Sequence, residues 1–512
     1  MSKFLSLMDA IKFHPFVFQA LATFFIFWII HKWFHKPNGS KKLPPSPPKL
    51  PIIGNLHQLM SSLPHHNLHR LSRKYGPLML VHLGSMPALA VSSMEGARAI
   101  LKTNDLSFAD RPTSWVAKKL FYGPKDVSLS PYGENWRQRK SICVLQLLSN
   151  RRVDSFRAIR KEETSLLLKK IEDSSGVLNL SQMFFEFSNG MISRAMSGHK
   201  FSEGENGKKF VSLWKDVSSS VGAINIGDFI PWLSWVARVN GFKAKVQRVA
   251  KELDEFLELV IQGRMGRTRE EKAKDIDLNK YGENFVDILL DIYQSNAYGV
   301  SFCKESVKGI LMDLLEGGTH TISIAQEWMM SEMLRHPEVL KRLQAEVRGI
   351  LKDRVDITDH DLEKMTYLKA VIKETLRLHP PIPLPLHKAR NDVKLMGYEV
   401  SAGTWVAINI FAIGRDPKIW DEPEKFNPDR FLNSSIDFKG QDFELIPFSS
   451  GRRGCPGISF AMANIEYTIA NLVQKFEWKL AEDGKELDMT ERQGLHVGRA
   501  VPLLALASKY QF

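Results

Sequence analysis

The sequence predicts a mainly helical protein with a minor β region. Several runs carry apolar residues at three- and four-residue spacing, the pattern of a helix with one buried face. These runs are 153–172, 242–263, 304–316, 323–334, 338–351 and 359–378. Short β-prone runs lie at 78–83, 88–91, 394–400 and 405–410. No internal repeat is detectable in the 512 residues, so a repeat architecture is excluded.

Charge and cysteine usage limit the classes of partner. The formal net charge of +13 suits an anionic membrane surface, an acidic protein or a nucleic acid. The positive charge is spread along the chain and no nucleic-acid-binding motif accompanies it, so we expect no nucleic-acid binding. The 3 cysteines, Cys143, Cys303 and Cys455, show no paired spacing. This argues against a disulfide framework or a cysteine zinc site and fits a reducing compartment.

The N-terminus carries the signal of a membrane anchor. Residues 15–30 are apolar except for Gln19 and Thr23, which is marginal for a membrane span and long for the core of a cleaved signal. The lysines that follow form a basic excess, which holds the next domain on the cytoplasmic side. We therefore expect a single-pass signal-anchor transmembrane helix with its basic flank at 1–36. The alternative is a cleaved secretory signal, but no small-residue cleavage site follows.

A proline-rich hinge is expected at 37–55, followed by one large domain at 56–512. Residues 43–48 read Leu-Pro-Pro-Ser-Pro-Pro. Prolines at this density exclude a helix and stiffen the chain, so the segment separates anchor from domain.

The stretch 448–457 resembles a loop that delivers one cysteine to a metal. Pro456 falls at the first turn of a predicted helix, so Cys455 lies at a helix N-terminus. Free backbone N–H groups and the helix dipole favour a thiolate there, and a thiolate ligates iron. Gly451 lets the backbone approach a flat ligand, and Arg453 supplies a cation for a carboxylate. The alternative for an isolated cysteine is a small buried apolar residue.

The pattern F-x-x-G-x-R-x-C-x-G, from Phe448 to Gly457, resembles the heme-binding loop of the heme-thiolate monooxygenases, the cytochromes P450. The resemblance covers nearly the whole chain and is strongest with the plant microsomal A-type group. It implies the cytochrome P450 fold, with a single catalytic domain behind the anchor. It also implies heme b with Cys455 as the proximal iron ligand, and Phe448, Gly451 and Arg453 as heme-binding residues.

Further segments resemble heme-contacting parts of the family. Trp136 and Lys140 match a W-x-x-x-R pattern whose tryptophan and cation meet a heme propionate, and Lys388 matches a cation that crosses beside the heme. Both cations are lysines where arginine is usual, which keeps the charge but loses the planar two-pronged geometry. The alternative for Lys140 is a surface lysine.

A structural ion cluster is also implied. Glu374 and Arg377 lie three residues apart on one helix face, close enough to pair. The resemblance adds Arg430 and implies that the three residues form a buried Glu/Arg/Arg cluster behind the heme, with no catalytic role.

The segment 317–321 departs from the family at one position. It resembles the oxygen-face motif [AG]-G-x-[DE]-T, in which glycine makes room for dioxygen while the acid and threonine relay protons. This implies catalytic roles for Gly318 and Thr321, with His320 in place of the acid. A histidine relays protons because its pKa lies near cytosolic pH. The alternative is that His320 packs away from the iron.

The resemblance implies a monooxygenase of the endoplasmic reticulum membrane. Electrons would come from NADPH through cytochrome P450 reductase, with cytochrome b5 as a second candidate partner. Segments implied to line the substrate site are mainly apolar: 108–121, 210–239, 309–320, 380–387 and 494–497. We therefore expect hydroxylation or epoxidation of a small, largely apolar plant specialised metabolite, a terpenoid, alkaloid or phenolic. The alternatives are a heme-thiolate dehydratase, isomerase or oxidative coupling enzyme, and a non-catalytic membrane heme protein.

Overall fold

The computed structural model describes residues 19–20, 23–25, 42–204, 207–223, 225–265, 283–296, 302–352, 354–481 and 486–511. The anchor predicted at 1–36 lies outside these ranges, apart from 19–20 and 23–25. Within the described part of the chain, no helix combines the length and the apolar character needed to cross a membrane. The described part of the hinge, from residue 42 on, lies against the first strand, since Pro45 O accepts the Leu80 N–H at 2.8 Å.

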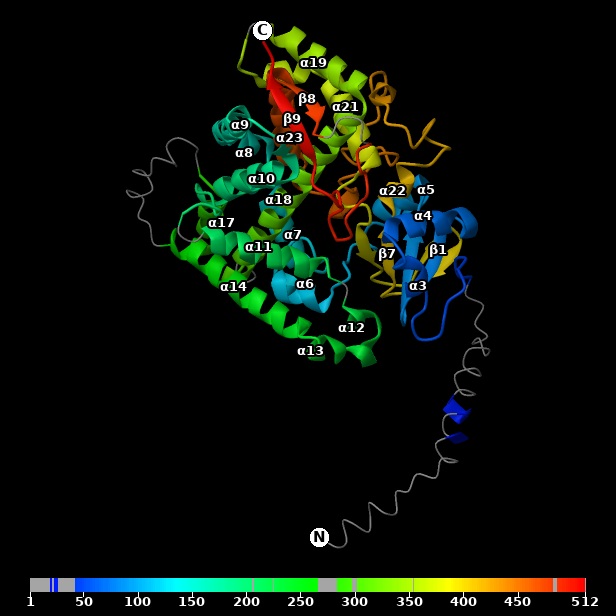
Figure 1. The fold of residues 1–512 in the computed structure, drawn as a ribbon. Coiled ribbons are helices and arrows are strands. Elements are labelled where there is room, and N and C mark those ends of the chain that lie inside the picture. The colour runs from blue at the N-terminus through cyan, green and yellow to red at the C-terminus, as the bar shows by residue number, and fades with distance from the viewer. Residues whose placement is uncertain are drawn as a thin grey trace.

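Long helices form most of the molecule (Figure 1). They are α9 (Arg157–Glu172), α10 (Leu180–Ser197), α11 (Gly207–Val221), α14 (Phe242–Gln262), α17 (Phe285–Gln294), α18 (Lys304–Arg335), α19 (Pro337–Leu351), α21 (Thr366–Leu378) and α23 (Ile458–Lys475). The remaining helices are α3 (Leu56–Leu59), α4 (Pro64–Tyr75), α5 (Met94–Arg98), α6 (Trp115–Leu120), α7 (Glu134–Ile142), α8 (Asn150–Ser155), α12 (Ile226–Phe229), α13 (Val236–Val239), α20 (Asp359–Lys364) and α22 (Ile410–Ile413). The predicted mainly helical class is confirmed.

The central helix is α18. Its 32 residues span about 48 Å at 1.5 Å per residue, and it packs against α10, α17, α21 and α23. The sequence pattern predicted two helices here, 304–316 and 323–334, but the structure has one. Gly317 and Gly318 do not break it because burial of its neighbouring side chains outweighs the modest helix penalty of glycine, about 1 kcal/mol each.

The strands form three small sheets. The largest has the order β1-β2-β7-β4, with β1 (Leu78–Leu83) antiparallel to β2 (Met86–Val91), β2 parallel to β7 (Trp405–Ile408), and β4 (Leu386–Lys388) antiparallel to β7. The second sheet has the order β3-β9-β8, from β3 (Leu178–Asn179), β9 (Leu504–Lys509) and β8 (Phe476–Leu480). The run predicted at 394–400 is a hairpin of β5 (Val393–Leu395) and β6 (Tyr398–Val400).

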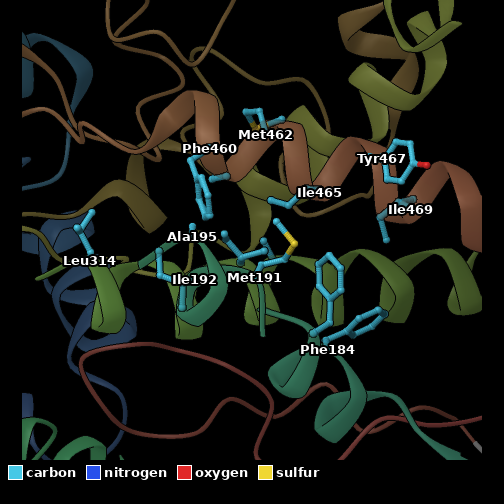
Figure 2. Close-up of a cluster of buried hydrophobic side chains, with 14 of the residues drawn as sticks. Phe184, Met191, Ile192, Ala195, Leu314, Phe460, Met462, Ile465, Tyr467 and Ile469 are labelled. Atoms are coloured by element: carbon cyan, nitrogen blue, oxygen red, sulfur yellow. The ribbon is translucent and has the colours of Figure 1, made fainter. Parts of the chain in front are cut away.

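The core is divided between the helical body and the sheet. Figure 1 shows α3, α4, α5 and α22 around the largest sheet, beside the helical body. Strand β2 is buried on both faces, since alternate residues enter two separate apolar clusters: Leu89 and Val91 in one, Ala88 and Ala90 in the other. In Figure 2, Phe460 projects from α23 towards Ile192 of α10, next to Leu314 of α18. This meeting of α10, α18 and α23 forms one wall of the site described next.

Candidate active site

A cavity of about 330 Å³ lies between α18 and the loop that precedes α23. Cys455 lines it, and so do Gly317, Gly318 and Thr321 of α18. The fold therefore brings the predicted metal ligand and the predicted oxygen-face motif to one enclosed space, although they lie more than 130 positions apart in the chain. Other lining residues are mainly apolar, among them Ile192, Leu314, Ala325, Leu376 and Ile382.

The loop that carries Cys455 is held by its own backbone. Residues Gly451–Arg453 make a single 3-10 turn, and the Cys455 N–H donates to Phe448 O at 3.0 Å. Cys455 Sγ accepts the Gly457 N–H at 3.3 Å, as the predicted position before a helix implies. Burial of the thiol nevertheless raises the pKa of Cys455, an effect larger than the lowering by Gly457 and Lys140. Metal binding favours the thiolate in addition, because it releases the proton of a cysteine ligand.

Phe448 and Gly451 have different surroundings. Phe448 lines the cavity. Gly451, predicted to lie beside a flat ligand, is not among the residues that line the cavity. Its φ is +68°, and a Cβ atom built there would lie 2.2 Å from Leu101 O. Glycine is required because the loop packs against the backbone of the preceding π-helical turn.

Three cations surround the cavity: Arg453, Lys140 and Arg111. Arg453 donates to Ala109 O at 2.6 Å and Val127 O at 3.1 Å, and Lys140 Nζ donates to Gly454 O at 2.6 Å. Arg111 donates to backbone carbonyls as well. Burial lowers the pKa of all three, that of Arg453 to about 10 and that of Arg111 to about 9.

Trp136 also lines the cavity and contacts Arg453, one of the three cations. Its Nε1 donates to Val127 O at 2.8 Å, and the Arg453 guanidinium stacks over its ring at 4.3 Å. Lys388 is not part of the lining; its backbone N–H bonds to Asp110 O at 2.8 Å within β4. Arg111, from the loop before α6, lines the cavity and donates to Leu386 O of β4.

These residues fit a heme. In the described part of the chain, Arg111, Lys140 and Arg453 bond to carbonyl oxygens and form no ion pair with a carboxylate. Three positive charges at the cavity, none of them paired with a carboxylate among the described residues, suit a ligand that brings carboxylates of its own. A sulfur ligand in the same cavity suits heme iron.

Glycine and threonine shape the face of α18 that lines the cavity. A Cβ atom built at Gly318 would lie 2.8 Å from the Ile192 side chain, so glycine permits the close contact between α18 and α10. Nothing lies within 4 Å of a Cβ atom built at Gly317, which leaves space on that face. The Thr321 Oγ1 atom donates to Gly317 O at 2.6 Å.

His320, predicted to take part in proton relay, is not among the residues that line the cavity. Successive helix residues point about 100° apart, so the His320 ring leaves α18 in a different direction from Thr321 and packs towards Trp214 and Ser218 of α11. Its Nε2 atom lies 2.7 Å from Ser218 Oγ, and its ring stacks with those of Trp214 and His496. Burial lowers the pKa of His320 to about 4, so the ring is neutral at cytosolic pH. The alternative reading, in which His320 packs away from the iron, agrees with this placement.

Glu374, Arg377 and Arg430, the predicted ion cluster, contact one another in the structure. Arg377 donates to Glu374 through Nε at 2.6 Å and Nη2 at 2.8 Å, and Arg430 Nε donates to Glu374 Oε1 at 3.0 Å. Arg377 also donates to the carbonyls of Pro423 and Lys425. The cluster thereby ties α21 to the segment that leads towards the cysteine loop.

Sequence reasoning missed two buried acids on α18. Asp313 lines the cavity and accepts the Val127 N–H at 2.7 Å, which fastens the loop before α7 to α18; burial raises the pKa of Asp313. Glu316 lies 3.5 Å from His496 Nδ1 and 4.0 Å from His320 Nε2, and burial raises the pKa of Glu316 to about 8. Asp313 stands four residues before Gly317, and Glu316 stands four residues before His320. This spacing puts each acid on the same helix face as a residue of the predicted motif, and it was the signal by which they could have been found.

The segments predicted to line the substrate site divide into two groups. Residues from 108–121, 309–320 and 380–387 contribute to the cavity lining. The segments 210–239 and 494–497 do not contribute to it. Ser218 and His496, from these two segments, contact His320 instead.

The family model described as Cytochrome P450 matches residues 44–504. The chain belongs to the cytochrome P450 family. This P450 is 53% identical over 505 residues to cytochrome P450 71A8 of Mentha piperita, covering 98% of this chain and 97% of that protein. It is 48% identical over 463 residues to tabersonine/lochnericine 19-hydroxylase of Catharanthus roseus, covering 89% of this chain and 91% of that protein.

A third plant relative and a solved structure are also similar to this chain. The P450 is 46% identical over 500 residues to norfluorocurarine oxidase of Strychnos sp, covering 96% of this chain and 98% of that protein. Its fold matches a zebra fish cytochrome P450 structure with abiraterone at a TM-score of 0.73 and 23% identity, covering 88% of this chain and 99% of the other. The predicted family and its plant A-type subgroup are confirmed. The P450 is an oxidoreductase of the monooxygenase class, and its family implies heme with a cysteine thiolate on iron.

Proposed function

We propose that this P450 is a monooxygenase of plant specialised metabolism that hydroxylates or epoxidises a small, largely apolar substrate. The observation that carries the proposal is the single cavity lined by both Cys455 and the Gly317–Thr321 face of α18. When bound, the heme supplies the activation of dioxygen and the transfer of one oxygen atom. The residues around it bind and orient the substrate and exclude water.

We assign the proximal side to the cysteine loop. Cys455 Sγ would hold the iron, and it accepts a hydrogen bond from the Gly457 N–H. Arg111, Lys140 and Arg453 provide the positive charge for the heme carboxylates, and Trp136 holds Arg453 in place by stacking. Because Lys140 Nζ also bonds to Gly454 O, one lysine connects the carboxylate side of the heme to the loop of its ligand.

We assign the oxygen side to α18. Gly317 leaves space, and the Thr321 hydroxyl lies beside it, bonded to Gly317 O. A hydroxyl is both donor and acceptor, so Thr321 holds a proton at Oγ1 within reach of the cavity. His320 has no part in this assignment, because its ring packs elsewhere and is neutral. The alternative of a reaction without oxygen insertion rested on His320 and loses that support.

The substrate class follows from the lining and from the relatives. The lining beyond the cation group is mainly apolar, so an apolar substrate recovers the free energy of burying its surface, about 25 cal/mol per Å². One relative is a tabersonine/lochnericine 19-hydroxylase and another a norfluorocurarine oxidase. We therefore propose an alkaloid-sized substrate, with terpenoids and phenolics as further classes.

Electron supply and location complete the proposal. We propose that electrons come from NADPH through cytochrome P450 reductase, and that residues 1–36 anchor the enzyme in the endoplasmic reticulum membrane. The formal charge of +13 favours both an anionic lipid surface and an acidic electron-donor protein. The experiment is product formation with NADPH, reductase and a panel of plant alkaloids, terpenoids and phenolics. Product that requires both NADPH and dioxygen supports the proposal, and product formed equally without dioxygen would reject it.

A further inference from the structure

Two histidines of α4 meet a glutamate from the far end of the chain, outside the heme cavity. His65 Nε2 lies 2.7 Å from Glu491 Oε2, and His66 Nε2 lies 2.9 Å from the same oxygen. The three ligand atoms all lie within 4.8 Å of one another. Among the residues that the structure describes, no other group of three histidine, cysteine or acidic side chains converges in this way.

The donors are held by their surroundings. The Phe411 ring packs against His65, with ring centroids 5.0 Å apart, and against His66 at 4.3 Å. Glu491 lies in a β-bridge with Arg499, so its backbone is fixed as well. Residues fixed by packing and by backbone bonds lose little entropy on binding a ligand. The cluster is therefore preorganised.

The donor set is that of an open zinc site. Zinc takes two imidazole nitrogens and one carboxylate oxygen in sites where water fills the fourth position. The His65 and Glu491 side chains are 2% and 10% exposed, while His66 is 44% exposed, so solvent has access from the His66 side. A tetrahedral site with bonds of about 2.1 Å separates its ligand atoms by about 3.4 Å. The present distances of 2.7 and 2.9 Å would have to open by about 0.7 and 0.5 Å to reach this geometry.

We propose that His65, His66 and Glu491 form a zinc-binding site, separate from the heme, that fastens α4 to the C-terminal segment 486–499. The nearby cation Arg415 does not prevent this, because Glu424 Oε2 pairs with its Nε at 2.9 Å and balances its charge. The site does not depend on the proposed function. The competing explanation is a pair of hydrogen bonds from two histidines to one carboxylate, which needs no metal.

Zinc titration of tag-free, full-length, heme-loaded protein distinguishes the two explanations. After treatment with a chelator, zinc is added in competition with a colorimetric chelator at pH 7.5, and thermal unfolding is followed with and without zinc. The wild type should bind one equivalent, and zinc should raise its melting temperature. His66→Gln and Glu491→Gln should each weaken binding at least tenfold and abolish the thermal shift. His66→Gln is the safer variant because this side chain is half-exposed.

The matched control is His360→Gln. His360 Nδ1 lies 3.5 Å from Glu363 in an exposed pair on α20, and no third histidine, cysteine or acidic side chain of the described residues joins them, so its loss should leave zinc affinity unchanged. X-ray absorption at the zinc edge should show two imidazole nitrogens and one carboxylate oxygen at about 2.0–2.2 Å. Failure of the wild type to bind zinc, or equal affinity in the wild type, His66→Gln and Glu491→Gln, would overturn the proposal in favour of the hydrogen-bonded pair.

Discussion

Replacement of Glu374 by glutamine tests the ion cluster behind the cysteine loop. The Glu374 and Arg377 side chains are both 0% exposed, and the carboxylate accepts from Arg377, from Arg430 and from the Asn427 N–H. Glutamine keeps the shape but removes the charge and one acceptor oxygen. It leaves the Arg377 guanidinium buried without an anion, which costs about 3–5 kcal/mol of unfolding free energy.

Denaturation in urea measures this cost. With a slope of about 3 kcal/mol per M, Glu374→Gln should lower the unfolding midpoint by roughly 1 M or more. If unfolding is irreversible, the same comparison is made on unfolding rates. The control is Asp429→Asn, which removes an exposed ion pair to Arg342 at 2.6 Å and should cost about 1 kcal/mol or less. Equal losses in the two variants would refute the reasoning, because burial would then not determine the cost.

Three further predictions concern the cysteine loop, His320 and the anchor. Gly451→Ala should lower heme occupancy and the melting temperature, because φ of +68° costs alanine about 1–2 kcal/mol and the Cβ atom would lie 2.2 Å from Leu101 O. The control is Gly349→Ala. Nothing lies within 4 Å of a Cβ atom there, so this variant should be neutral or stabilising in the same thermal unfolding measurement. The pKa of His320 falls from 6.5 in the unfolded chain to about 4, so the unfolded state binds the extra proton and stability falls as pH drops from 6.5 towards 4. His320→Gln should therefore remove about 3 kcal/mol of the acid-induced loss of unfolding free energy, measured by unfolding at several pH values. The same variant should leave the coupling of NADPH use to product unchanged at pH 7. A loss of coupling would show that His320 takes part in the proton relay. Deletion of residues 1–42 should release the protein from membranes with its heme retained, and heme loss would show that the domain boundary is misplaced.

The sequence was sufficient where a local pattern determines the structure. The helix after Cys455 could be predicted because Pro456 suits a first turn and the apolar spacing continues behind it. The β1–β2 hairpin could be predicted from β-prone runs on either side of Gly84. The contact of Glu374 with Arg377 follows from their spacing on one helix face.

Tertiary packing determined what the sequence did not reveal. Helix α10 is buried on nearly all sides, so it lacks the one-sided apolar pattern by which helices are recognised. Gly451 resembles a ligand-facing glycine, but only the folded chain brings Leu101 O against it. Which of His320 and Thr321 faces the cavity depends on the rotation of α18 about its axis, which is fixed by its contacts with α10 and α23.

The sequence also does not show which cationic side chains line the cavity. Arg111, Lys140 and Lys388 all lie in segments that were predicted to line the site or contact the heme, and only the folded chain shows that Arg111 and Lys140 line the cavity and Lys388 does not. For Cys455 the helix N-terminus favours a thiolate, while burial raises the pKa of the metal-free thiol, and the sequence alone does not show this second effect.

The carbon monoxide difference spectrum of the reduced protein tests the central claim most directly, namely that Cys455 is the thiolate ligand of a heme in the described cavity. Cys143 is the decisive control, because it also lines the cavity and burial raises its pKa to about 12, which keeps it a thiol. The wild type and Cys143→Ser should both give the thiolate-type spectrum, and Cys455→Ser should not. A thiolate-type spectrum that survives in Cys455→Ser, or that disappears in Cys143→Ser with heme still bound, would contradict the account.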